Sequence, residues 1–395
     1  AQQNSYVTIP RAANSFDNTE IAANVDENII DSLTGGRLVG SVTSFENFAE
    51  CPLRYYLRYG VDLKEREEFT FSPVNFGVVL HAVIREVCDE IKKNGESYYL
   101  ISEEKRREMV KRSVAAITDI YQNSILKDSS RNSFMIKRME DLADRTVWAM
   151  GEQLKCGDFV PFVFEHKFNM EVGDGDRKQL MSGTIDRVDI CENGTDVYVR
   201  IIDYKTGKKD FNIVKTYYGI DIQLMVYMEA AMKLVAKMRP GKNVIPAGVF
   251  YYNISDPIVS ATTESAEEIE DKIKGELRLK GMVNSDKDIA EKMDNTEGTS
   301  LNIPVSRKAD GGFDSRRSKV MNTEQFNILG RFVDVRAIDT ADRIAGGDIR
   351  RSPYKDGQFS SCDRCPYGAV CGFSVDLPGC NYRKLKKFDD EVLWN

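Results

Sequence analysis

The hydrophobic period of the chain changes near its middle, and this change most constrains the fold. Residues 162–170, 181–190, 195–205 and 244–254 are short runs rich in Val, Ile, Phe and Tyr, a composition typical of β-strands. The second and third runs are separated by the turn "ENGT", and an apolar helical run, 221–238, precedes the fourth. A strand meander, a crossover helix and another strand predict a mixed sheet with helices packed on it, so we expect an α/β fold.

Apolar residues recur at helical spacing on both sides of this strand region. The stretch "TSFENFAECPLRYYLRYG", residues 43–60, has a hydroxyl residue ahead of an acidic first turn and closes with Gly60, which fits a capped helix. Residues 281–318 are polar and contain a hairpin-like turn, "DGGF". Further helices are expected over residues 74–91, 102–127, 133–155, 263–280 and Thr323–Ala345.

Size and charge limit the classes of protein to consider. With 395 residues, of which 42% are apolar, the chain can bury a substantial core. A formal net charge of −7 argues against a surface that coats nucleic acid nonspecifically, but it permits a local basic groove. No run is long and apolar enough for a membrane span, and the first residues lack a signal-peptide pattern, so we expect a cytoplasmic protein without membrane contact.

The first forty residues differ from the rest in being polar and weakly periodic. We expect residues 1–40 to be a linker from a missing upstream region, although signal processing or tag removal can also produce such a start. Residues 41–395 are then expected to form one domain.

The strand run 195–205 ends in "DYK", which places Asp203 and Lys205 on one face because strand side chains alternate. Asp186 lies in the preceding run, so the three side chains can converge at one end of the sheet. Two carboxylates suit Mg²⁺ or Mn²⁺, and a lysine beside them can steady a phosphate oxygen or orient water. The pattern indicates a phosphodiester-cleaving centre. The alternative is a weak surface ion pair, with Asp186 paired to Arg187 or a strand neighbour.

Histidine and glutamate side chains can join this centre. His81, one of two histidines, follows Gly77 by four residues on a predicted helix, where the glycine leaves room beside the imidazole. A lone histidine on an apolar helix is more often a core residue than a ligand. Either Glu165 or His166 can face the site, but strand alternation excludes both at once.

Gln223 and Tyr227 are four residues apart on the predicted helix that follows the acidic strand, so they share one face. Their amide and hydroxyl groups can hold a DNA backbone or the attacking water by hydrogen bonds. The same spacing also fits a helix rim with a half-buried tyrosine.

Cysteines gather near the C-terminus, as Cys362, Cys365, Cys371 and Cys380. A disulfide framework is not expected in a long cytosolic chain, so the cluster suggests a metal centre shared by the first three. The fourth ligand is either Cys380 or the distant Cys51, which would staple the two ends of the domain together. A zinc knuckle closed by Cys380, or ordinary buried thiols, is the alternative.

Four short motifs together suggest a family that none of them would suggest alone. "GVVLH", "GTIDRVD", "DYKTGK" and "QLMVY" together resemble the RecB-type branch of the PD-(D/E)XK nuclease superfamily. Cys51 with the C-terminal trio resembles the iron–sulfur staple of members of that branch. The opening "SVTSFENFAECPLRYYLRYGVDLKERE" and the ending "CDRCPYGAVCGF" are most similar to the nuclease domain of the AddB family of bacterial helicase–nuclease proteins.

The resemblance implies a restriction-endonuclease-like core, a mixed sheet flanked by helices, with a helical insertion and the staple joining the two ends. Lys205 would stabilise the transition state, supported by Gln223 and Tyr227. The implied metal ligands are His81, Asp186, Asp203 and the backbone carbonyl of Tyr204. The implied ligands of a structural four-iron, four-sulfur cluster are Cys51, Cys362, Cys365 and Cys371.

The implied activity is Mg²⁺-dependent exonucleolytic hydrolysis of single-stranded DNA, on the strand that ends 5′, during processing of double-strand breaks for recombinational repair. The implied partner is an AddA-type helicase–nuclease in a heterodimer. The chain has no G-x-x-x-x-G-K-[ST] loop, so the motor is expected in a missing N-terminal part or in the partner. Phosphate contacts and base stacking are expected from Arg54, Tyr55, Tyr56 and Arg58, with helix packing accounting for part of this run.

Two other functions fit some of the same residues. One is a different RecB-type iron–sulfur nuclease, either CRISPR-associated or replication-linked. The other is a noncatalytic DNA-binding scaffold, which is disfavoured because His81, Asp186, Asp203 and Lys205 are all present.

Overall fold

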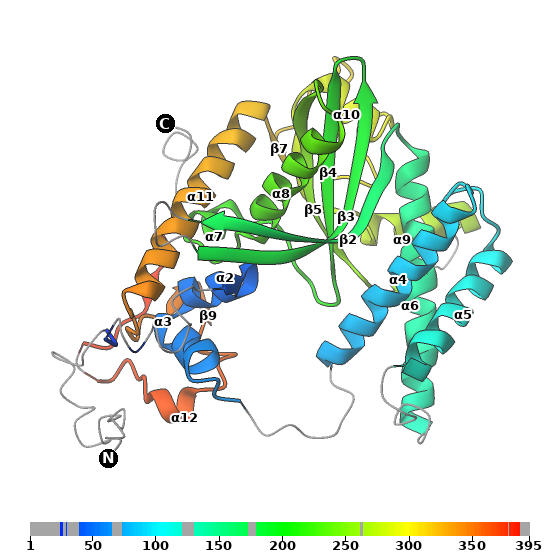
Figure 1. Ribbon diagram of the computed structural model, residues 1–395. Coiled ribbons are helices and arrows are strands. Elements are labelled where there is room, and N and C mark those ends of the chain that lie inside the picture. The colour runs from blue at the N-terminus through cyan, green and yellow to red at the C-terminus, as the bar shows by residue number, and fades with distance from the viewer. Residues whose placement is uncertain are drawn as a thin grey trace.

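A mixed seven-stranded sheet forms the centre of the molecule (Figure 1). The computed structural model describes residues 24–26, 29, 39–64, 73–120, 130–172, 179–260, 264–377 and 379–387. The strands of the large sheet are β1 (Val39–Ser41), β2 (Val160–Val172), β3 (Gln179–Asn193), β4 (Asp196–Lys205), β5 (Asn243–Asn253), β6 (Lys280–Asn284) and β7 (Val320–Met321).

The strand order is β1-β3-β4-β5-β6-β7, with β2 paired to β3 off this path. One edge of β3 pairs with β2 along its length, while the other edge pairs with β1 near its start and with β4 near its end. β2, β3 and β4 form an antiparallel meander, and β4 and β5 run parallel because a helix crosses between them. The predicted mixed α/β sheet is therefore confirmed.

Helices cover both faces of this sheet (Figure 1). One face packs against α4 (Pro73–Lys93), α5 (Glu103–Ile120) and α6 (Ser130–Lys155). The other face packs against α2 (Val42–Glu50), α8 (Gln223–Met238) and α11 (Thr323–Ala345). The alternation of strand residues separates these two cores, since Tyr198 and Ile202 belong to the first and Val199 and Ile201 to the second.

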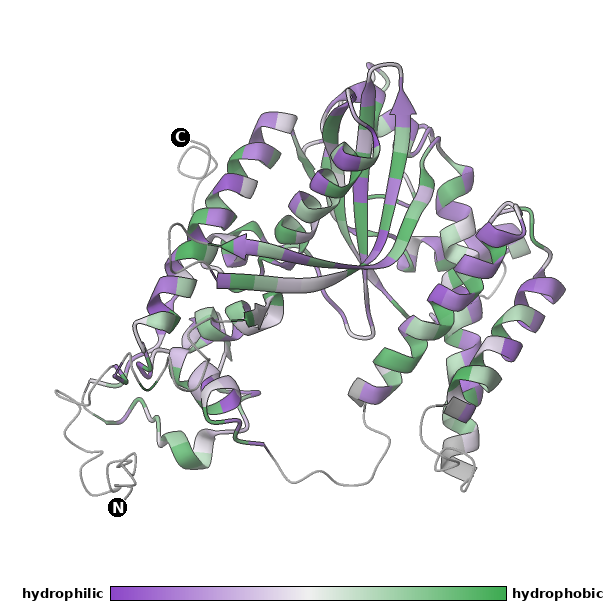
Figure 2. Ribbon diagram, in the orientation of Figure 1, coloured by the Kyte–Doolittle hydropathy of each residue, from purple (hydrophilic) through white to green (hydrophobic). Residues whose placement is uncertain are grey.

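Hydropathy follows this layering (Figure 2). The strands of the central sheet carry hydrophobic segments interrupted by hydrophilic residues, and α5 and α6 also alternate between the two along their length. An outer helix needs only one apolar stripe, whereas the buried strands place apolar side chains in both cores.

Most predicted helices are present, and α11 has the bounds predicted for it. The single helix predicted over residues 43–60 is wrong, because the chain extends at Cys51, before Pro52. A residue that precedes proline disfavours the helical conformation, so α2 ends there. After it come α3 (Pro52–Tyr55) and one π-helical turn, η2 (Tyr56–Gly60).

The polar segment 281–318 holds more structure than its composition suggested. It contains most of β6 and a short helix, α10 (Lys287–Met293), capped by Asp286. The "DGGF" turn is hairpin-like as predicted, with Arg307 and Phe313 forming an antiparallel bridge. The helix predicted over 102–127 ends at Ile120 as α5, and the rest of that range lies outside the described residues.

The two ends of the described chain meet on one side of the molecule, where α2 and α3 lie near α12 (Gly368–Cys371) (Figure 1). The Tyr367 hydroxyl donates to the carbonyl of Leu63 at 2.9 Å, across 304 positions of sequence. A small three-stranded sheet completes this region, with β8 (Tyr354–Asp356) between β9 (Phe359–Ser360) and β10 (Arg383–Lys384). Two further helices are α7 (Ile213–Tyr217) and α9 (Ala266–Glu276).

Residues 1–40, predicted to be a linker, lie mostly outside the described residues. Within this range Asn24 bridges Asp348 and the Val25 N–H donates to the carbonyl of Gly347, while β1 begins at Val39. The proposed division at residue 40 stays a prediction. None of the helices in the described part of the chain is both long and apolar enough to cross a membrane.

Candidate metal centre and catalytic site

Asp186 and Asp203 come together at one end of the β3–β4 pair, as the sequence predicts. Arg187 pairs with Ile202 in the antiparallel register, so the two aspartates occupy the next opposed positions. Oδ2 of Asp186 accepts the backbone N–H of Tyr204 at 2.6 Å. This bond fixes one oxygen of Asp186 and leaves the other directed at the helical layer.

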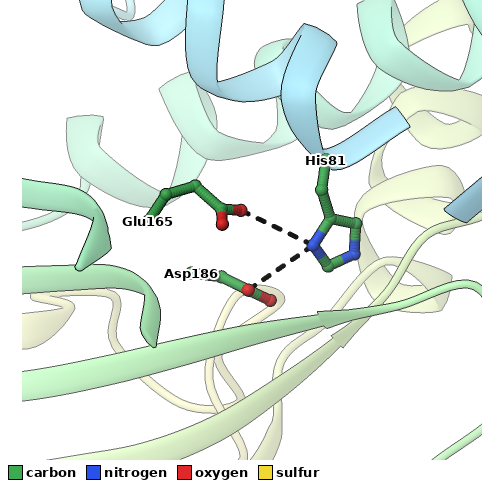
Figure 3. Close-up of side chains that lie close together, drawn as sticks. All are labelled: His81, Glu165 and Asp186. Atoms are coloured by element: carbon green, nitrogen blue, oxygen red, sulfur yellow. Dashed lines mark ion pairs between the residues drawn. The ribbon is translucent and has the colours of Figure 1, made fainter. Parts of the chain in front are cut away.

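That second oxygen faces His81, which extends from α4 toward the sheet (Figure 3). His81 Nδ1 lies 3.4 Å from Asp186 Oδ1 and 3.7 Å from Glu165 Oε1. One ligand atom from each of the three side chains lies within 4.8 Å of the others. An imidazole nitrogen and two carboxylate oxygens at this spacing suit a divalent cation.

Glu165, rather than His166, faces the site, because the β2–β3 register places Glu165 opposite Asp186. Its φ of 49° lies in the left-handed region, which non-glycine residues adopt at a cost of roughly 1–2 kcal/mol. The flanking residues keep the ladder, with Phe164 opposite Arg187 and His166 opposite Ile185. Strained residues of this kind concentrate at functional sites, because only the surrounding structure maintains them. Alternation alone leaves the choice between the two residues open, and the ligand set implied by the family resemblance omits Glu165.

The pKa of His81 reflects its two acidic neighbours. Burial alone lowers the pKa of an imidazole, but hydrogen bonding and charge from Asp186 and Glu165 outweigh burial and raise it to about 10. The two carboxylates therefore stabilise the protonated, positively charged imidazole of His81.

A second chain of polar contacts begins at Asp203. Its Oδ2 lies 2.5 Å from Nζ of Lys205, which is 26% exposed, whereas Asp203 is buried. Lys205 Nζ also donates to Oε1 of Gln223 at 2.9 Å, and Gln223 Nε2 donates to the hydroxyl of Tyr227 at 2.9 Å. The four residues predicted from "DYK" and "QLMVY" thus form one connected group, and α8 sets the direction of the ammonium.

Asp203 is harder to ionise than an ordinary aspartate. Burial and the charge of Asp186 raise its pKa to about 6, and Lys205 opposes this rise. Burial also raises the pKa of Tyr227, which keeps its phenol neutral. Asp186 and Asp203 are thus two close carboxylates that repel each other, and Lys205 supplies the nearby counter-charge.

The sequence predicts that Gly77 leaves room beside His81, but no neighbouring protein atom requires a glycine there. A side chain at this position would meet Thr206 at 3.6 Å, which is ordinary van der Waals contact. Gly77 lies beside the loop that follows β4, but the surrounding residues would tolerate a methyl group there.

A buried ion network lies on the face of β3 and β4 that α4 covers. Asp189 accepts two hydrogen bonds from Arg187, at 2.7 and 2.6 Å, and one from Arg200 at 2.8 Å. All three side chains are at most 1% exposed. The pKa of Asp189 is lowered because the two guanidinium groups outweigh the effect of its burial.

Cys51 meets the C-terminal trio, although it lies about three hundred positions away. The sulfur-bearing residues Cys51, Cys362, Cys365 and Cys371 line one small cavity together with Tyr367 and Phe373, whereas Cys380 is not among its lining residues. Burial and the neighbouring thiols raise the pKa of Cys371 to about 11. Buried thiols in this arrangement ionise readily only when a metal binds them.

The aromatic and basic run after Cys51 is less exposed than its predicted DNA contact requires. Tyr55 and Tyr56 are only 7% and 8% exposed, so neither presents a free ring face for stacking. Arg54 is paired with Glu50, while Arg58 lies over the ring of Tyr59 at 5.4 Å. The burial of the two tyrosines argues against the predicted stacking, and DNA contact by Arg54 and Arg58 stays a prediction.

Comparisons with known proteins agree with this geometry. A family model described as the PD-(D/E)XK nuclease superfamily matches residues 40–372. A protein of Clostridium acetobutylicum, named as a subunit of an ATP-dependent helicase/deoxyribonuclease, is 34% identical over 372 residues, which cover 92% of this chain and 32% of the relative. Proteins of the same name from Clostridium botulinum and Thermoanaerobacter sp. are each 33% identical, covering 98% and 90% of this chain and 34% and 32% of their own lengths. The chain spans about a third of these relatives.

Proposed function

Because this chain belongs to the PD-(D/E)XK nuclease superfamily, we propose that it hydrolyses single-stranded DNA with the help of Mg²⁺ or Mn²⁺. One observation carries the proposal. His81, Glu165 and Asp186 offer ligand atoms within 4.8 Å of one another, beside an aspartate that already contacts a lysine. A structural ion pair does not need a strained glutamate and a third acidic group at the same point.

The ligands of the divalent metal would be His81, Glu165, Asp186 and Asp203, with the backbone carbonyl of Tyr204. When bound there, the metal would supply Lewis-acid stabilisation of a phosphate oxygen and favour ionisation of water. The side chains present fit such an ion, because hard cations prefer carboxylate and carbonyl oxygens and the three closest groups are already gathered.

Lys205 would donate a hydrogen bond to the scissile phosphate and offset the charge that builds on its oxygens as water attacks in line. Gln223 keeps the ammonium aimed, since its amide oxygen accepts from Nζ while its amide nitrogen is bound to Tyr227. The 26% exposure of Lys205 leaves the ammonium open to a substrate, whereas Asp203 beneath it is buried.

We further propose that Cys51, Cys362, Cys365 and Cys371 hold a four-iron, four-sulfur cluster with a structural role. Their common cavity supports this set, and the position of Cys380 outside it supports Cys51 as the fourth ligand. A single zinc ion with four bonds of about 2.3 Å would need sulfurs roughly 4 Å apart. Within the described residues, the only group of three ligand side chains inside 4.8 Å is the one at His81, so the thiols stand wider than a zinc site.

The proposed assembly rests on the names of the relatives, which describe one component of an ATP-dependent helicase/deoxyribonuclease. We propose that this chain is the nuclease domain of an AddAB-type heterodimer, with an AddA-type helicase–nuclease as its partner. Its substrate would be the strand that ends 5′ as duplex ends are unwound for recombinational repair. The ATP-driven motor would then lie elsewhere in the complex.

The test is degradation of single-stranded DNA labelled at either end, with Mg²⁺, and with EDTA as the metal-free control. Lys205→Ala should lower the rate by roughly a hundredfold or more, because it removes a charge-stabilising donor. Lys208→Ala is the matched control, since Lys208 is an exposed lysine of the loop that follows β4. Binding without cleavage by the wild-type chain would favour the scaffold alternative.

A further inference from the structure

The N-terminus of α8 is capped from a distant part of the chain. Ile222, at the N-cap position, makes no side-chain cap of its own. Instead, Oε1 of Glu46 on α2 accepts the backbone N–H groups of Ile222 at 2.9 Å and Gln223 at 3.0 Å, across 176 and 177 positions of sequence. The first N–H groups of a helix lack partners within it, and a carboxylate there also meets the positive end of the helix dipole.

Glu46 holds the same residue that orients the catalytic lysine. Gln223 is the first residue of α8, and its side chain accepts from Lys205 Nζ at 2.9 Å. A shift of this helical turn would therefore move the acceptor that aims the ammonium. Misplacement of a catalytic group by about 1 Å can cost two orders of magnitude in rate.

The other end of α2 is fixed by the C-terminal segment. The helix ends at Glu50, and Cys51 follows directly as its C-cap. The Arg383 guanidinium donates to the carbonyls of Ala49 and Glu50, which closes the last turn of α2. The placement of α2, and hence of Glu46, depends on the segment that also carries Cys362, Cys365 and Cys371.

The surroundings of Glu46 are charged and mutually bound. Lys209 Nζ lies 3.0 Å from Asp221 Oδ1, the same oxygen that accepts the Tyr251 hydroxyl at 2.7 Å. Burial raises the pKa of Glu46 to about 7, and the charge of Lys209 opposes that rise. A neutral glutamic acid still accepts hydrogen bonds through its carbonyl oxygen, so the cap does not depend on ionisation alone.

We propose that Glu46 is a positioning residue. It makes the placement of Lys205 depend on the position of α2, which is held in turn by the C-terminal segment that carries the cysteines. The proposal rests on the proposed nuclease function. A purely structural cap would stabilise the fold without changing how Lys205 meets the substrate.

The first experiment compares the wild-type chain with Glu46→Ala and Glu46→Gln in cleavage of single-stranded DNA. The glutamine amide oxygen can still accept both N–H groups, whereas alanine leaves them without this acceptor. We expect kcat of Glu46→Ala to fall roughly 10- to 100-fold while KM stays within about twofold, and Glu46→Gln to recover most of the loss.

Asp286→Ala is the matched control. Asp286 also accepts two backbone N–H groups, from Asp288 at 2.9 Å and Ile289 at 3.2 Å, but it caps α10, which carries no residue of the site. Its loss should leave kcat within about twofold of wild type, because the removed bonds are equivalent and only their location differs.

Hydrogen exchange supplies a readout that does not depend on cleavage. Glu46→Ala should raise exchange at residues 222–226, the first turn of α8, while β4 and β5 stay protected. Arg383→Ala should raise exchange at the same α8 amides, since it releases the end of α2 without altering Glu46.

Equal kcat values for wild type and Glu46→Ala would overturn the proposal, as would equal losses in Glu46→Ala and Glu46→Gln. Unchanged α8 exchange in Arg383→Ala, or a rise that affects β4 and β5 equally, would also overturn it. If the wild-type chain itself fails to cleave single-stranded DNA, the proposed function fails, and the exchange data still decide whether Glu46 and Arg383 fix α8.

Discussion

The ring of Tyr227 occupies the space that a side chain at Gly183 would need. A Cβ atom at Gly183 would lie 2.9 Å from Cε1 of Tyr227 and 2.7 Å from the ring of Phe168. The two rings pack edge to face, with centroids 5.6 Å apart, directly over the glycine. The glycine of "GTIDRVD" thus permits the aromatic contact that supports Gln223 and Lys205.

Gly183→Ala should therefore impair both stability and cleavage. Overpacking of this kind costs about 1–3 kcal/mol, and displacement of Tyr227 should lower kcat roughly tenfold or more. Urea unfolding and single-strand cleavage measure the two effects. Gly330→Ala is the control, because a Cβ there meets no atom within 4 Å and alanine favours the α11 helix by about 1 kcal/mol. A fully active and stable Gly183→Ala protein would contradict the packing described.

Two substitutions of Glu165 should have the same effect on metal binding but different effects on stability. Glu165→Gly and Glu165→Ala both lack the carboxylate, so both should need roughly tenfold more Mn²⁺ for half-maximal cleavage. Only alanine retains the strain of the left-handed backbone, so the glycine variant should be more stable than the alanine variant by about 1 kcal/mol. Calorimetric Mn²⁺ titration and urea unfolding check the two parts separately, and equal stability of the two variants would count against strain at this position.

Asp334 on α11 should make stability depend on pH. Burial, with the hydrogen bond and charge of Glu229, raises the pKa of Asp334 to about 7. The folded state therefore holds this proton more tightly than the unfolded state, whose aspartate has a pKa of about 4. This contribution is fully present below about pH 4 and is lost as the pH rises through about 7.

Asp334→Asn should be more stable than wild type at pH 8, by about 1 kcal/mol after solvent screening, and the difference should shrink as the pH falls. Urea unfolding at several pH values measures this. Asp339→Asn serves as a control, because Asp339 pairs with Arg343 on the solvent side of the same helix at 3.7 Å. A difference between Asp334→Asn and wild type that does not vary with pH would refute the assignment.

Cysteine substitution should separate the proposed ligands from the remaining thiols. Cys51→Ala or Cys365→Ala should lower iron content and visible absorbance of protein prepared without oxygen, because four thiolates are needed to complete the set. Cys380→Ala should leave both unchanged, since Cys380 lies outside the common cavity. Stoichiometric zinc in place of iron, or loss of metal in Cys380→Ala, would restore the zinc-knuckle alternative.

The convergence of Asp186, Asp203 and Lys205 could be predicted because strand alternation and a short turn determine it locally. Glu165 could not be chosen over His166, because the choice depends on the register of β2 against β3, which strand alternation alone does not give. Glu46 could not be predicted for another reason: its hydrogen bonds join elements 176 positions apart, and its own helix shows only an ordinary acidic residue. Burial of Tyr55 and Tyr56 depends on the same long-range packing, so the sequence alone predicts more exposure than the fold allows.

In the buried network Asp189 pairs with both Arg187 and Arg200, and the charge of the buried Asp294 also acts on Arg200. The three paired side chains belong to β3 and β4, the strands that also carry Asp186 and Asp203. A charge in the interior is screened by salt far less than one at the surface. The pairing of β3 with β4 at this point should therefore depend little on ionic strength. On this view chelation should abolish catalysis while leaving the sheet and its helices intact.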